Sequence, residues 1–165
     1  MRSDRKLSAQ SGHFPVSRCS DPLHARPVER GSLIVRSLWA ACLVIGGLTH
    51  ARILLQHGLF WDYGGANPIS AAYWTSLTLL DPLAAALLFI APRAGIVATV
   101  VLIVTNVLHN LAVTAHFAPA GEFLTLASHP ILLSQIGFMV FVLATVRTAW
   151  LGAVRAGSAK PIPGT

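Results

Sequence analysis

Residues 70–93 of this 165-residue chain read SAAYWTSLTLLDPLAAALLFIAPR, an apolar stretch with an acid and a proline at its centre. A helix of about 20 apolar residues is long enough to cross the ~30 Å hydrocarbon core of a bilayer. Asp81 would then lie near the midplane, where an acid costs roughly 2.5–3.5 kcal/mol on insertion scales. The surrounding Leu, Phe and Ile residues each favour insertion by about 0.3–0.6 kcal/mol. We therefore predict a membrane span in which Asp81 faces protein rather than lipid.

The composition of the whole chain is that of a membrane protein. Hydrophobic residues make up 54% of the sequence and charged residues only 11%, whereas soluble proteins have about 25% charged residues. The net charge of +6 does not come from a basic stripe interleaved with aromatic residues, so the pattern disfavours nucleic-acid binding. Cys19 and Cys42 fall at different predicted depths, which disfavours a disulfide between them.

Four apolar stretches predict an all-α fold, an integral membrane antiparallel four-helix bundle in contact with the lipid bilayer. We expect one domain over residues 33–152, with spans at about 33–57, 70–92, 94–117 and 130–151. Residues 1–32 are polar and basic and predict a disordered cytoplasmic tail, and residues 153–165 predict a mobile one. Residues 118–129 are too few for a domain and predict an interfacial turn.

The distribution of basic residues predicts the orientation of the bundle. The side that holds both termini would carry the basic N-terminal tail and five further basic residues, Arg36, Arg93, Arg147, Arg155 and Lys160. The opposite side would carry Arg52 and the acidic loop residues Asp62 and Glu122. Lys and Arg are enriched on the cytoplasmic side of membrane proteins. We therefore expect both termini in the cytoplasm and the protein in the inner membrane of a bacterium.

Every predicted span contributes polar side chains to the central or outer half of the bundle. We take the following residues as candidates for a small ligand-binding or proton-exchanging pocket: His50, Trp74, Thr78, Asp81, Asn106, His109, Asn110 and Gln135. Asn106, His109 and Asn110 are spaced i, i+3, i+4 and so share one helix face. The structural alternative is that such residues join helices through hydrogen bonds, each worth about 0.6 kcal/mol.

Three functional hypotheses fit this pattern. In the first, Asp81 pairs with His109 or His50 to exchange protons or orient a ligand. In the second, His50 and His109 are axial ligands of a b-type haem or belong to a quinone site. In the third, the chain is a non-catalytic accessory subunit whose polar layer meets another membrane protein or a second copy of itself. No nucleophile–base arrangement or phosphate loop is visible, which favours a non-enzymatic role. Asp81 is the only carboxylate within a predicted span, which disfavours a metal centre built from several carboxylates.

Several segments together carry a family resemblance. They are His50-Ala51, AAYWTSLTLLDPLAA at 71–85, NVLHNL at 106–111 and QIGFMVFVLAT at 135–145. Over residues 33–152 the chain resembles small bacterial inner-membrane proteins with four spans and, more loosely, the DoxX-like four-helix membrane proteins, some of which accompany quinone-linked oxidoreductases. The resemblance implies an architecture and a bacterial membrane location, and it assigns no functional residue.

The orientation can be tested with reporter fusions. Fusions after Asn67 and Gly121 should report a periplasmic location, and fusions after Arg93 and Ala159 a cytoplasmic one, because the basic residues hold their side in the cytoplasm. Paired reporters active on opposite sides of the membrane measure this directly. The opposite pattern at two of the four sites would refute the predicted topology.

Overall fold

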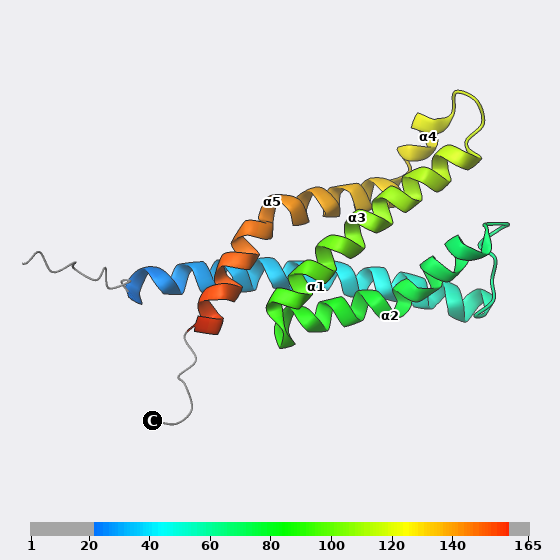
Figure 1. Cartoon of the computed structure of the whole chain (residues 1–165). Coiled ribbons are helices and arrows are strands. Elements are labelled where there is room, and N and C mark those ends of the chain that lie inside the picture. Colours follow the sequence, from blue (N-terminus) through cyan, green and yellow to red (C-terminus); the bar gives the residue numbers. More distant parts are fainter. Residues whose placement is uncertain (1–21, 159–165) are drawn as a thin grey trace, which may run out of the picture.

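The computed structural model describes residues 22–158, and this part of the chain is helical and contains no strand. It forms five helices: α1 (Pro22–His57), α2 (Pro68–Ile90), α3 (Pro92–Phe117), α4 (Phe123–Ala127) and α5 (Pro130–Ser158). Each long helix packs against two others, in the order α1, α2, α3, α5 and back to α1. Figure 1 shows that the start of α1, the α2–α3 junction and the end of α5 lie at one end of the bundle. The α1–α2 loop and α4 lie at the other end.

Four of these helices are long and apolar enough to cross a membrane. The qualifying segments are Val28–His57, Pro68–Ile90, Pro92–Phe117 and Pro130–Arg155. Large apolar side chains are exposed along all four, as Ile45, Leu79, Val101 and Val140 illustrate. Contiguous apolar surface of this extent is rare on soluble monomers and fits contact with lipid. Within the described residues, the predicted all-α fold with four long apolar helices is confirmed.

Two predicted boundaries are wrong because α1 and α5 are longer than expected. Residues 22–32, predicted to belong to a disordered tail, are helical, and so are residues 153–158, predicted to be mobile. The remaining parts of both predicted tails, 1–21 and 159–165, lie outside the described residues. The N-terminal extension packs against the last part of α5: Ser32 Oγ donates a hydrogen bond of 2.8 Å to the Ala149 carbonyl. A Cβ added at Gly152 would overlap the Ser32 side chain, so tertiary packing holds a segment whose composition predicted a coil.

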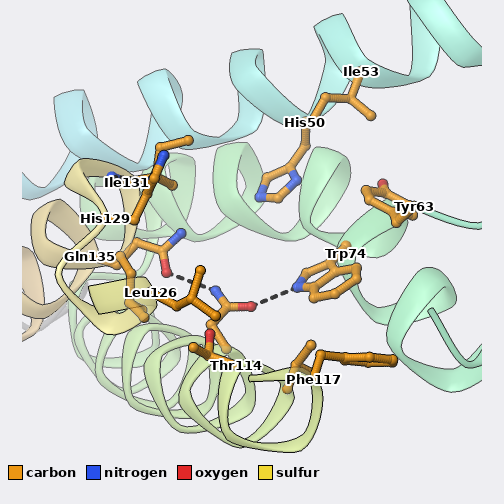
Figure 2. A pocket seen from close by; sticks show the side chains of 13 residues that line it. His50, Ile53, Tyr63, Trp74, Thr114, Phe117, Leu126, His129, Ile131 and Gln135 are labelled. Atoms are coloured by element: carbon orange, nitrogen blue, oxygen red, sulfur yellow. Dashed lines mark hydrogen bonds between the residues drawn. The ribbon is translucent and has the colours of Figure 1, made fainter. Parts of the chain in front are cut away.

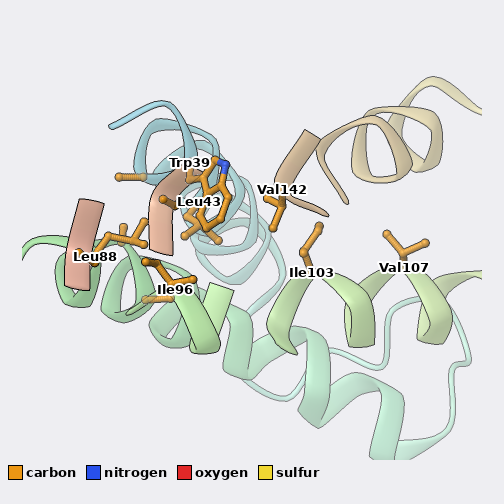
Figure 3. Close-up of a cluster of buried hydrophobic side chains, with 12 residues drawn as sticks. Trp39, Leu43, Leu88, Ile96, Ile103, Val107 and Val142 are labelled. Atoms are coloured by element: carbon orange, nitrogen blue, oxygen red, sulfur yellow. The ribbon is translucent and has the colours of Figure 1, made fainter. Parts of the chain in front are cut away.

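The hydrophobic core is built from all four long helices. Trp39 and Leu43 of α1 meet Leu88 of α2, Ile96 and Ile103 of α3 and Val142 of α5 (Figure 3). The Trp39 indole is fully buried and donates a 3.1 Å hydrogen bond to Thr145 Oγ1. This satisfies the one polar atom of the largest core side chain, as buried Trp requires.

A single residue joins α2 to α3. Ala91 is both the C-cap of α2 and the N-cap of α3, and Pro92 follows at once. In a continuous helix the Leu88 carbonyl would accept from the N–H of residue 92, but proline has none. Arg36 of α1 is buried and donates from Nη1 to that carbonyl at 2.7 Å. Arg36, expected to lie at the membrane edge, therefore closes the C-terminal end of α2, where a cation is also favoured by the helix dipole.

Close approach of α3 to α2 depends on the absence of a side chain at Gly95. A Cβ added there would overlap the backbone of Leu87 and Leu88. Gly137 of α5 is the contrasting case, because an added Cβ would meet nothing within 4 Å.

We expect Gly95→Ala to lower the thermal stability of the purified protein in detergent and Gly137→Ala to leave it unchanged or raise it. Overpacking at Gly95 costs about 1–3 kcal/mol, whereas alanine at an open helical position gains roughly 0.5–1 kcal/mol over glycine. Thermal unfolding followed by circular dichroism measures both variants. Equal stability of the two variants would show that the α2–α3 contact is not constrained as described.

Candidate functional site

A cavity of about 470 Å³ lies between the helices at the end of the bundle that carries α4 (Figure 2). Every helix contributes to its lining, and most of the wall is apolar or aromatic. The apolar residues that line it are Ile53, Val113, Phe117, Leu126, Ile131 and Leu132. Four of the pocket candidates identified from sequence also line it: His50, Trp74, Asn110 and Gln135.

An amide network connects three helices beside this cavity. Trp74 Nε1 of α2 donates to Asn110 Oδ1 of α3 at 2.8 Å, and Asn110 Nδ2 donates to Gln135 Oε1 of α5 at 2.7 Å. Asn110 Nδ2 also lies 3.2 Å from Asn106 Oδ1, one turn along the same helix. Hydrogen bonds of this kind stabilise helix association in membranes. The network therefore fixes the positions of α2, α3 and α5 around the cavity.

His50 offers the cavity an imidazole nitrogen that the protein leaves unused. Figure 2 shows its ring pointing from α1 into the space in front of Trp74. Its Nδ1 is buried and has no hydrogen-bond partner among the described residues. A buried polar atom normally has a partner, and a neutral imidazole presents one donor and one acceptor. His50 therefore lies at the cavity with one ring nitrogen buried and unpaired.

The α1–α2 loop adds an aromatic wall that sequence reasoning did not assign to the site. Tyr63 lines the cavity and lies 5.1 Å from Trp74 between ring centroids. Trp61 lies 4.6 Å from Tyr63 and stacks on His57 at 4.0 Å. Tyr63 has a φ of 54°, a left-handed conformation that is uncommon outside glycine. Its inward position depends on this loop geometry, and the sequence feature that accompanies it is a cluster of aromatic residues at 60–63.

His109 is separated from the cavity by aromatic rings. Its ring lies 4.7 Å from that of Tyr73 and 5.5 Å from that of Trp74, and it does not line the cavity. His50 lines the cavity and His109 does not, so a haem ligated by both residues stays a prediction. The described residues also contain no group of three or more His, Cys, Asp or Glu side chains that could hold a metal ion.

Asp81 lies deeper, at the contact between α2 and α1. A Cβ added at Gly46 would be 3.0 Å from Asp81 Oδ2, and one at Gly47 would be 3.5 Å from Asp81 Cβ. Across residues 28–155 the Asp81 side chain has no recorded hydrogen bond or ion pair, so the expected direct pair with His50 or His109 does not form. Thr78, one turn closer to the cavity, has a buried hydroxyl without a partner in the same part of the chain.

Comparisons of this chain with protein-family models, with curated proteins and with solved structures found no match. The case for a function therefore rests on the cavity and on the polar residues around it.

Proposed function

We propose that this chain is a multi-pass protein of a bacterial inner membrane that binds a small, mainly apolar molecule in the cavity beside α4. Four helices of sufficient length and apolarity support membrane insertion. Arg93, Arg147 and Arg155 belong to the end that holds the start of α1, whereas Asp62 and Glu122 belong to the loops at the cavity end. By the positive-inside rule, this asymmetry supports cytoplasmic termini and a cavity near the periplasmic surface.

The observation that carries the proposal is the cavity itself, with His50 in its lining. Its volume of about 470 Å³ falls within the range of roughly 300–1,000 Å³ that is typical of small-molecule sites. Such sites combine a mostly apolar wall with a few convergent polar groups. The wall here has that composition, and the polar groups converge from α1, α3 and α5.

The side chains around the cavity indicate the chemistry of the ligand. Trp74 and Tyr63 offer aromatic surfaces on which a flat ring can pack. The Trp74–Asn110–Gln135 hydrogen bonds are already formed within the protein. The other polar side chains of the lining, among them His50, Thr114 and His129, are the groups that we propose bind a hydroxyl. A neutral aromatic molecule with one hydroxyl group fits these features. The site contains no nucleophile–base pair among the described lining residues, so binding rather than turnover is the proposed role.

Filling the cavity should abolish binding. We expect Val113→Phe to remove the saturable quenching of Trp74 fluorescence by 4-bromophenol, a neutral ring with one hydroxyl whose bromine quenches nearby indoles. Val113 lines the cavity, whereas the adjacent Ala112 is exposed on the outer face of α3. Ala112→Phe is therefore the matched control and should retain quenching. Trp74→Phe identifies the part of the signal that comes from the cavity.

Two results would contradict the proposal. Quenching that rises linearly with 4-bromophenol in the wild-type protein would indicate partition into the micelle without a site. Equal saturable quenching in Val113→Phe and Ala112→Phe would place the site elsewhere. Co-purification of a stoichiometric membrane protein, together with either result, would favour the accessory-subunit hypothesis.

A further inference from the structure

We propose that Asp81 is a proton-binding site that exchanges protons with the cavity along a buried polar face shared by α1 and α2. The inference rests on the cavity of the proposed function but not on the identity of its ligand. It assigns the protein a second, deeper site, whose ligand is the proton.

The spacing of residues connects the two sites. Trp74, Thr78 and Asp81 are spaced i, i+4, i+7 on α2, and Gly46, His50 and Ile53 have the same spacing on α1. Residues at these intervals share one helix face. Trp74, His50 and Ile53 line the cavity, while Asp81 and Gly46 are in contact at the other end of the two faces. The joined faces therefore run from the cavity to the Asp81 carboxyl group.

Buried polar atoms without partners surround this route. Within the described part of the chain there are four such side-chain atoms, His50 Nδ1, Tyr73 Oη, Thr78 Oγ1 and His109 Nε2. Leaving a buried polar group unpaired costs about 1–3 kcal/mol. Internal water molecules commonly satisfy such groups, and a line of water molecules at these atoms would connect the cavity to Asp81. The route thus offers hydrogen-bonding groups between the cavity and Asp81.

Among the described residues, no Lys or Arg side chain forms an ion pair with Asp81 that would hold it ionised. The helices packed on α2 are α1 and α3. α1 presents Gly46 and His50 to this region, and α3 presents His109, which contacts Tyr73. Tyr73 is also within electrostatic range of the Asp81 carboxylate. Arg36 is the nearest basic residue of α1 toward the other end, and it is bound to the Leu88 carbonyl.

Protonation of Asp81 removes the free-energy cost of keeping an ionised carboxylate in an apolar environment. An ionised carboxylate without a partner is strongly disfavoured in an apolar environment. Protonation forms one O–H bond on the carboxylate; the proton comes from hydronium at the cavity end of the route, which is left as water. Deprotonation is the reverse transfer. Gly46 makes this possible sterically, because a side chain there would press on Asp81 Oδ2.

Labelling with dicyclohexylcarbodiimide tests the proton directly, because this apolar reagent reacts with protonated carboxyl groups in the membrane. With the full chain in lipid vesicles, mass spectrometry should find the label on Asp81 and not on the exposed loop acids Asp62 and Glu122. The labelling rate should fall about tenfold for each pH unit above the titration midpoint, as the protonated fraction does. Absence of label at Asp81, or a rate that does not depend on pH, would overturn the inference without any variant being made.

Sided vesicles test the route. Raising the pH only on the side that bears α4, identified by the reporter fusions, should protect Asp81, while raising it only on the other side should not. Thr78→Val removes the hydroxyl from the route and should abolish this protection, whereas Thr105→Val, at an exposed position on α3, should leave it intact. Protection from the opposite side would refute the route. If 4-bromophenol does not bind but the sided labelling is as expected, only the proposed ligand site is refuted. If 4-bromophenol binds but the labelling of Asp81 is not sided, only the proposed proton site is refuted.

Discussion

The junction between α2 and α3 constrains the rest of the bundle. Only Ala91 separates the two helices, Pro92 cannot donate to the Leu88 carbonyl, and Arg36 of α1 supplies that hydrogen bond. Gly95 lets the α3 backbone lie directly against α2. Three helices are thereby fixed at one end, beside the core formed by Trp39 and Leu88. The opposite ends are joined by longer connections, and it is there that a cavity forms between them.

The sequence predicts the four long helices well because each has enough apolar residues to identify it without reference to its neighbours. It fails where order comes from a distant contact. The segment at 22–32 has no apolar period, yet Ser32 bonds to the Ala149 carbonyl of α5 and packs against Gly152. That contact joins residues far apart in the chain and leaves no local signal. The same reasoning applies to Arg36, whose charge indicates a membrane edge but whose partner is a carbonyl on another helix.

For the candidate site, the sequence determines depth but not the direction in which a side chain points around its helix. Depth alone grouped His50, Trp74, Asn110 and Gln135, which line one cavity in the structure; their role in binding stays a prediction. Depth also suggested a pair between Asp81 and His109. The rotation of the helices separates them, since Asp81 faces Gly46 of α1 while His109 packs on Tyr73 and Trp74. The position of Tyr63 could not be predicted, because it depends on the left-handed backbone conformation of Tyr63 itself within the loop.

The polar side chains within the bundle divide into two groups, those whose polar atoms have hydrogen-bond partners within the protein and those with an unpaired buried atom. Asn106, Asn110, Gln135 and Trp74 bond to one another, so joining helices is a sufficient reason for their presence. His50, Thr78, Tyr73 and His109 each keep a buried atom unpaired, and helix association gives no account of them, because an unpaired polar group in an apolar setting lowers stability. His50 and Thr78 lie on the helix faces that connect the cavity to Asp81, and His109 packs on Tyr73 and Trp74. The proposed ligand at His50 and water along the proposed route to Asp81 would complete these hydrogen bonds.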